Sequence, residues 1–315
     1  MNIPSLLQKM HEEKTLSAKQ LNYLLDIHKK KLFSVHQELR FSFYAGILLV
    51  IAGLGLTIKQ YFAQLGDIAI IGSLTAGSLA SFIYCFAKGN SYSHKEVASP
   101  NIAFDYILFF GCTLYSMDIA YSETQFHVLG NLWNNYLLAS FVLFLFLAYR
   151  YDNRVVLSLA LSTLAAWFGF TVTESRFSFQ EYHRLYAIAY SCLTLLIGIF
   201  LYRLAVKKHF FDIYLNFATH FLFVALLSGV IHYKLFSLYF LCFLAACVIL
   251  VLYSLRTKRF LYMLYAIIYG YIGISIVGLD IIRRNTFLVL TYFIVTSLAV
   301  IVLIFSLSRK FKENA

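Results

Sequence analysis

Ten apolar stretches, most of them about 20 residues long, follow one another along the chain with short polar segments between them. A helix needs about 20 apolar residues to cross a hydrocarbon core about 30 Å thick. It also satisfies its own backbone hydrogen bonds where no water is present. The pattern therefore predicts an all-α fold, a polytopic transmembrane helical bundle of about ten spans. We place the spans near residues 41–59, 68–87, 103–121, 134–150, 155–173, 185–206, 210–232, 236–255, 260–279 and 287–307.

The longest polar connection between spans runs from Lys88 to Asn101. It contains glycine, asparagine, serine and proline, which are common in loops. The same pattern divides the chain into three regions. They are a cytoplasmic N-terminal segment (1–40), a ten-span transmembrane domain (41–308) and a short basic cytoplasmic tail (309–315).

The N-terminal segment is patterned as a pair of amphipathic helices. A short apolar face precedes Ser17-Ala18-Lys19-Gln20, which matches a capping box, with the Ser17 hydroxyl and the Gln20 side chain each bonding the other's amide. The second helix then carries apolar residues in steps of three and four, the spacing of a packed seam, and no breaker separates it from the first span. The seam consists of Leu21, Leu25, His28, Leu32, Val35 and Leu39.

Three interpretations of this seam stand side by side. It packs on the first short helix, or it binds a second copy of the chain or a cytoplasmic protein partner. In the third, the helix lies on anionic lipid headgroups through Lys29, Lys30 and Lys31. In the second interpretation, the function of this segment is to form a homo-oligomer or to bind a cytoplasmic partner protein.

The start of the chain resembles a family of bacterial membrane proteins grouped as domain of unknown function 2157. The resemblance covers residues 5–87 and rests on Leu16-Ser17-Ala18-Lys19-Gln20 and on the glycine-containing stretch from Gly46 to Gly55 that enters the first span. The family has a glycine in the turn between the two helices and a tryptophan after the first span, and this chain has neither. The resemblance implies a bacterial cytoplasmic membrane and no catalytic activity.

Composition and charge agree with a membrane protein and give its orientation. The chain is 61% hydrophobic and 13% charged, far from a soluble average. Its net charge of +11 does not point to nucleic acid, because the basic residues lie between the apolar runs. With ten spans both termini lie on one side, which collects 20 of the 26 Lys and Arg residues and leaves six on the other. The positive-inside rule therefore predicts cytoplasmic termini.

Four arginines are spaced evenly along the chain. Arg150, Arg203, Arg256 and Arg309 each end an even-numbered predicted span, at intervals of 53 residues. One interpretation is a duplicated helical hairpin, which would give parallel repeats. The other is chance, because any hairpin of two spans with short loops takes about 50 residues.

Few ionisable residues fall inside spans, where a charge costs about 2.5–3.5 kcal/mol at the membrane centre. In the seventh span one helix face carries Asp212, Asn216, Thr219 and His220. One interpretation is a polar path along this face, with His220 relaying a proton or lining a cavity. The other is a core histidine that hydrogen-bonds a tyrosine on a neighbouring span.

A second candidate is an acidic, imidazole-bearing mouth on the outer side, which would attract cations. Its residues are Asp118, His232 and Asp280 at the outer ends of the third, seventh and ninth spans. Scattered charges at loops are more often solvated, and the spacing matches no metal motif. We therefore expect no metal site and no cofactor.

The sequence carries no nucleotide-binding, zinc-protease or serine-nucleophile motif. Three functions remain. The first is a transporter or channel with a polar path near His220. The second is a non-catalytic scaffold or sensor acting through the N-terminal helices. The third is an intramembrane enzyme acting on lipid, for which no catalytic residues are visible.

Overall fold

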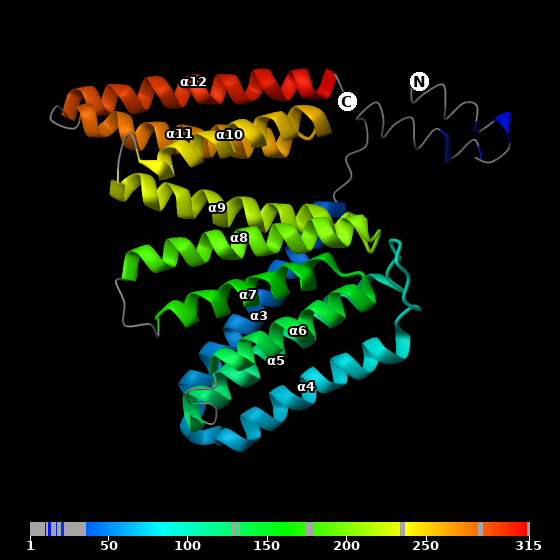
Figure 1. Cartoon of the computed structure of the whole chain (residues 1–315). Coiled ribbons are helices and arrows are strands. Elements are labelled where there is room, and N and C mark those ends of the chain that lie inside the picture. Colours follow the sequence, from blue (N-terminus) through cyan, green and yellow to red (C-terminus); the bar gives the residue numbers. More distant parts are fainter. Residues whose placement is uncertain are drawn as a thin grey trace. The chain divides into compact units, whose positions relative to one another are not determined.

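The computed structural model describes residues 36–127, 130, 133–173, 179–233, 237–282 and 286–313, with residues 10, 12, 13, 17, 20 and 21 nearer the N-terminus. Every long element in this part of the chain is an α-helix, and none of its residues forms a strand (Figure 1). The helices are α3 (His36–Leu65), α4 (Asp67–Lys88), α5 (Ile102–Phe126), α6 (Trp133–Tyr151), α7 (Arg154–Thr173), α8 (Phe179–Arg203), α9 (Phe211–Tyr233), α10 (Leu238–Thr257), α11 (Phe260–Ile282) and α12 (Thr286–Glu313), with the short 3₁₀ helix η2 (Lys208–Phe210) before α9.

The predicted all-α fold is confirmed, and each predicted span falls on one of these helices. Within the described residues, seven helices are long and apolar enough to cross a membrane: α3, α4 and α8 through α12. The apolar parts of α6 and α7 are shorter. α8 ends at Arg203 although the apolar pattern continues to Val206. The number of ten spans stays a prediction.

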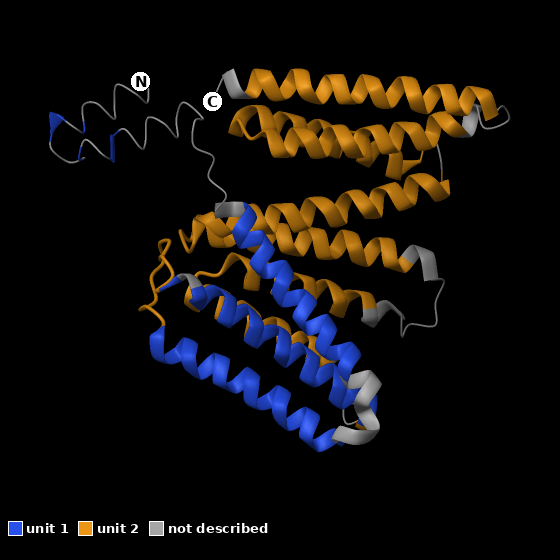
Figure 2. Ribbon diagram, turned by 180° about the vertical axis from the view of Figure 1, so that it is seen from behind, with its two compact units in different colours: residues 1–88, 101–125 blue, residues 89–100, 126–315 orange. Residues whose placement is uncertain are grey.

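The chain forms two compact units, shown in different colours in Figure 2. The first comprises residues 1–88 and 101–125. In it, Ile70 and Leu74 of α4 pack against Leu114 of α5. Arg40 of α3 forms an ion pair with Asp105 of α5 at 2.9 Å. Gly66, which separates α3 from α4, has a φ of +68°, a left-handed conformation that favours glycine.

The second unit comprises residues 89–100 and 126–315. Its helices follow an up-and-down order in which each of α6 to α12 packs against the next (Figure 1). The core lies where α9, α10 and α11 meet, around Phe223, Phe243 and Tyr262. At Gly198 the backbone of α8 lies close to α9. A larger residue would not fit there, because an added Cβ would lie only 2.7 Å from the Cβ of Tyr214.

Burial differs sharply among the apolar helices of this unit. Half of the apolar stretch of α9 is buried inside the protein, whereas none of the stretch in α12 is. Large apolar side chains such as Phe305 and Val302 are 67% exposed on α12. Such a surface is stable in a lipid environment and unfavourable in water. The apolar helices therefore indicate a membrane protein, and the apolar stretch of α9 is the most buried of those in the second unit.

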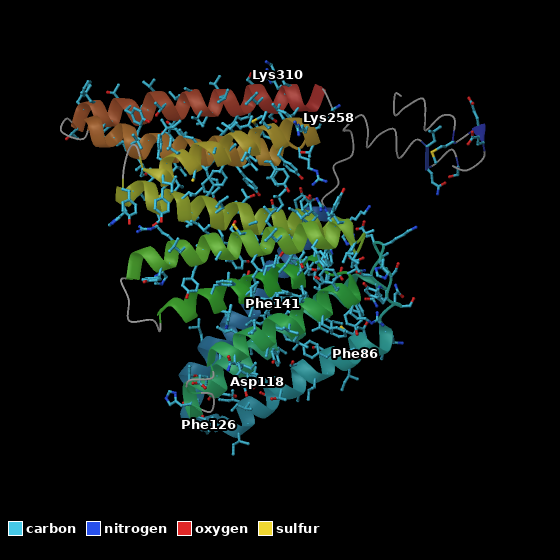
Figure 3. All side chains as sticks on the ribbon, viewed as in Figure 1. Phe86, Asp118, Phe126, Phe141, Lys258 and Lys310 are labelled. Atoms are coloured by element: carbon cyan, nitrogen blue, oxygen red, sulfur yellow. The ribbon has the colours of Figure 1, made fainter. Side chains whose placement is uncertain are left out.

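The four evenly spaced arginines lie at or near the C-terminal ends of α6, α8, α10 and α12. These ends gather at one end of the second unit, as the positions of Lys258 and Lys310 in Figure 3 illustrate. The spacing thus reflects a repeated up-and-down hairpin geometry. Gene duplication and chance both remain compatible with it.

The capping box predicted at the N-terminal segment is confirmed. The Ser17 amide donates to Gln20 Oε1 at 2.9 Å, and the Gln20 amide donates to Ser17 Oγ at 3.3 Å. α3 runs without a break from His36 through the first predicted span. Residues 22–35 lie outside the described residues, so the continuity of the second amphipathic helix with α3 stays a prediction. Four of the six seam residues, Leu25, His28, Leu32 and Val35, lie outside the described residues, so the partner of the seam stays a prediction.

Candidate functional site

The polar face predicted on the seventh span lies on α9, and each of its residues has a defined environment. Asp212, in the first turn, forms an ion pair with Arg259 in the connection between α10 and α11. Thr219 is buried, and Asn216 and His220 are partly buried. The face therefore runs from one end of α9 toward its middle.

His220 is hydrogen-bonded to a tyrosine on a neighbouring helix. Its Nδ1 lies 2.8 Å from the hydroxyl of Tyr269 on α11. Its ring meets Tyr265 edge-on, with the ring centroids 4.6 Å apart. The ring of Tyr269 in turn stacks on Phe223 of α9. This geometry matches the interpretation of a packed core histidine, and it gives the imidazole a partner through which a proton could pass.

Asn216 has a different environment. Its side-chain oxygen is buried and accepts no hydrogen bond within the described part of the chain. Leaving a buried acceptor unpaired costs about 1–3 kcal/mol. Asn216 lies one turn from Asp212 on the same face. It is therefore the residue of this face that most needs a partner from outside the protein, such as water or a solute.

The residues of the expected outer mouth have separate environments in the structure. Asp118 of α5, labelled in Figure 3, accepts a hydrogen bond from the Thr75 hydroxyl at 2.6 Å. His232 is exposed in the last turn of α9 and packs edge-on against Tyr233. The side chain of Asp280 lies outside the described side chains. Asp118 belongs to the first unit and His232 and Asp280 to the second, so the mouth stays a prediction.

A buried charge cluster, which the sequence analysis missed, lies at the other end of the second unit. Asp152, in the turn between α6 and α7, binds Lys207 Nζ at 2.9 Å and His209 Nε2 at 2.5 Å. The side chains of Lys207 and Asp152 are only 1% and 2% exposed. We call these three residues the turn cluster, because they join the turn after α6 to the turn before α9.

The turn cluster also holds the long connection between α4 and α5. The amide of Val97 donates to Asp152 Oδ2 at 2.6 Å, and the amide of Lys207 donates to the carbonyl of His94 at 2.8 Å. The ammonium of Lys207 lies 5.5 Å from the ring centroid of Tyr92. Residues 89–100 are thus held against the rest of the second unit by hydrogen bonds to Asp152 and Lys207 of the turn cluster.

An open pocket of about 940 Å³ lies beside the turn cluster and shares His209 with it. Its charged lining residues include four cations and one carboxylate, so it is strongly basic. We call it the basic pocket. It is lined by Arg154, Ile199, Tyr202, Arg203, Lys208, His209, Phe211, Asp212, Tyr253, Thr257 and Arg259.

The cations of the basic pocket are in different states of pairing. Burial alone would lower the pKa of Arg259, but the hydrogen bond and the charge of Asp212 outweigh it and raise that pKa above its ordinary value. Lys208 Nζ lies 5.5 Å from the ring centroid of Tyr202. Within the part of the chain that the structure describes, neither Arg203 nor Lys208 forms an ion pair.

One basic residue assigned by sequence to the outer side, Arg184, is 3% exposed. Its guanidinium lies 5.2 Å and 5.7 Å from the ring centroids of Tyr233 and Tyr239, which stack on each other. From its place between two predicted spans, Arg184 is expected to be a solvated loop charge. In the structure it is buried and lies over the two aromatic rings. These rings are about 50 residues away along the chain, so no local motif predicts the contact.

Among the described residues, no group of three or more His, Cys, Asp or Glu side chains is placed to hold a metal ion.

Comparisons with family models, with curated proteins and with solved structures each found no match for the chain. The resemblance of residues 5–87 to domain of unknown function 2157 therefore stays a prediction.

Proposed function

We propose that the chain is a multi-pass protein of a bacterial cytoplasmic membrane, with both termini in the cytoplasm, that transports a small solute along the polar face of α9. The observation that carries this proposal is the buried Asn216 oxygen, which has no hydrogen-bond partner among the described residues and lies one turn along α9 from Asp212, a residue that lines the basic pocket. The path would continue past Thr219 to His220. The hydroxyl of Tyr269 would take part in it by exchanging protons or hydrogen bonds with the imidazole.

Cysteine accessibility tests this path. In a chain whose five native cysteines are replaced by alanine, Asn216→Cys and His220→Cys should react with a membrane-impermeant thiol reagent added from the cytoplasmic side. Val248→Cys is the matched control, because Val248 lies on α10, outside the polar face of α9, and is 58% exposed on the surface that would face lipid. A folded, inserted protein in which Asn216→Cys is as inert as Val248→Cys would contradict the path.

A second function is supported by the N-terminal segment: a non-catalytic scaffold or sensor acting through its helices. The supporting observations are the formed capping box and the single helix α3, which carries the first predicted span from His36 onward. If the second amphipathic helix joins α3 as predicted, it would pass a movement of the segment to the first span. Leu25→Asp with Leu32→Asp should change the oligomer size in detergent if the seam binds a second copy. An unchanged size would favour packing within the chain.

A further inference from the structure

The basic pocket has a surplus of positive charge that the described part of the chain does not neutralise. Among the described lining residues Asp212 is the only carboxylate, and its partner is Arg259. Arg154, another cation of the lining, is paired with Glu96 at 2.8 Å. Both side chains are more than half exposed, so water weakens this ion pair. Arg203 and Lys208 keep their full charge toward the pocket.

The residue types around this surplus suit a phosphate group. A guanidinium presents a planar fork of donors that matches phosphate oxygens, and a lysine adds a point charge. The rings of Tyr202 and Tyr253 also line the pocket, and their hydroxyls are hydrogen-bond donors. A volume of about 940 Å³ is within the range of about 300–1,000 Å³ typical of small-molecule sites.

The position of the pocket narrows the ligand further. Arg203 and Lys208 lie where α8 ends and α9 begins, at the end of the unit that the positive-inside rule assigns to the cytoplasm. Ile199, one turn before Arg203 on α8, and Phe211 add apolar side chains to the lining. Basic pockets between helices at this level are suited to the headgroups of anionic lipids.

The turn cluster gives this pocket a fixed wall. His209 lines the pocket and is bound at Nε2 by the buried carboxylate of Asp152. The neighbouring Lys207 is itself buried and held by the same carboxylate. Lys208, between these two residues, is therefore presented from a short helical turn whose neighbours cannot move freely.

We propose that the basic pocket binds a phosphomonoester group, carried by an anionic lipid headgroup or by a free phosphate compound, through Arg203 and Lys208. This site does not require that a solute pass along α9. Phosphatidic acid and diacylglycerol with the same acyl chains are suitable probes, because they differ only in the phosphate.

Native mass spectrometry of the full chain in maltoside micelles tests the proposal. Phosphatidic acid should bind, and diacylglycerol should not. Arg203→Gln with Lys208→Gln should weaken phosphatidic acid binding about tenfold or more, as expected when charge-assisted hydrogen bonds are lost. Arg309→Gln with Lys310→Gln is the matched control, because it removes the same charge from exposed residues of α12 that do not line the pocket. The control should change binding less than about twofold.

Competition with inorganic phosphate distinguishes the two sources of the group. Displacement of phosphatidic acid by millimolar phosphate supports recognition of the free anion, and retention of the lipid supports a headgroup site. Equal binding of diacylglycerol, or an equal loss in the pocket and control variants, would overturn the proposal. Thermal unfolding of each variant shows that a loss of binding does not come from a loss of fold. A failure of the α9 path would leave all of these results unchanged.

Discussion

Individual charged residues in this chain have effects that depend on their burial, as two ion pairs beside the turn between α6 and α7 illustrate. Asp152 and Lys207 are almost fully buried, whereas Arg154 and Glu96 are 54% and 64% exposed. Removing one partner of a buried pair leaves a desolvated charge, while an exposed charge is solvated again by water. The turn cluster is therefore expected to matter far more for stability than the surface pair.

Lys207→Met should lower the free energy of unfolding by about 3–5 kcal/mol, because it leaves the Asp152 carboxylate buried with one charged partner fewer. Arg154→Gln is the matched surface control and should cost less than about 1 kcal/mol. Thermal unfolding in nanodiscs measures both. Adding Asp152→Asn to Lys207→Met should recover part of the loss. Equal effects of Lys207→Met and Arg154→Gln would mean that the cluster is not a stabilising centre.

The hydrogen bond of His220 allows a second prediction at this scale. Tyr269→Phe removes the hydroxyl and should destabilise the protein by about 1–3 kcal/mol, because an imidazole nitrogen loses its partner inside the protein. Tyr265→Phe, one turn away on α11, keeps the ring against His220 and leaves the 2.8 Å contact to Tyr269 intact, so it should have a much smaller effect. Similar shifts in melting temperature for both variants would count against a specific hydrogen bond.

At the scale of helices, the structure depends on how each helix ends. α8 ends at Arg203, after which Ala205 takes a φ of +58°, and the amide of Val206 donates to the carbonyl of Leu201 at 3.1 Å. This is the left-handed helix termination that glycine usually makes. An alanine there carries backbone strain, which the fixed turn before α9 imposes.

Ala205→Gly should therefore stabilise the protein by up to about 1 kcal/mol, because glycine adopts a positive φ without strain. Ala187→Gly, in the interior of the same helix, should instead destabilise it by about 0.5–1 kcal/mol. Chemical or thermal unfolding of the two variants compares the same substitution in two backbone conformations. A destabilising Ala205→Gly would contradict the strained termination.

The helices and their caps could be predicted from the sequence, whereas the contacts between distant turns could not. The helices follow from apolar windows, and the Ser17–Gln20 capping box follows from a local motif, so both are readable along the chain. The turn cluster is not readable in this way. Asp152 and Lys207 each occupy a short polar turn, where a charge is normally solvated, and only the return of α7 and α8 brings them together. For the same reason Arg184 and the basic pocket escape sequence analysis.

At the scale of the whole molecule, the distribution of charge predicts an orientation in the membrane. The helix ends that carry Arg150, Arg203, Arg256 and Arg309 lie at one end of the second unit. The basic pocket is at that end as well. A negatively charged cytoplasmic leaflet attracts such a surface by about 1 kcal/mol per basic residue near it. Arg203, which lines the pocket, would thus contribute both to orientation and to headgroup binding.

Reporter fusions at helix ends test this orientation. Fusions after Arg150, Arg203 and Arg256 should report the cytoplasm, and fusions near Glu123, Gln180 and Arg284 should report the outer side, because 20 of the 26 basic residues lie on the first side. Deleting residues 2–30 should leave this pattern unchanged, since the first span keeps its apolar run and Arg40. Two or more reversed reporters in the full chain would mean that one of the ten spans is misplaced. The three fusion sites on α6, α8 and α10 would then identify the helix pair concerned.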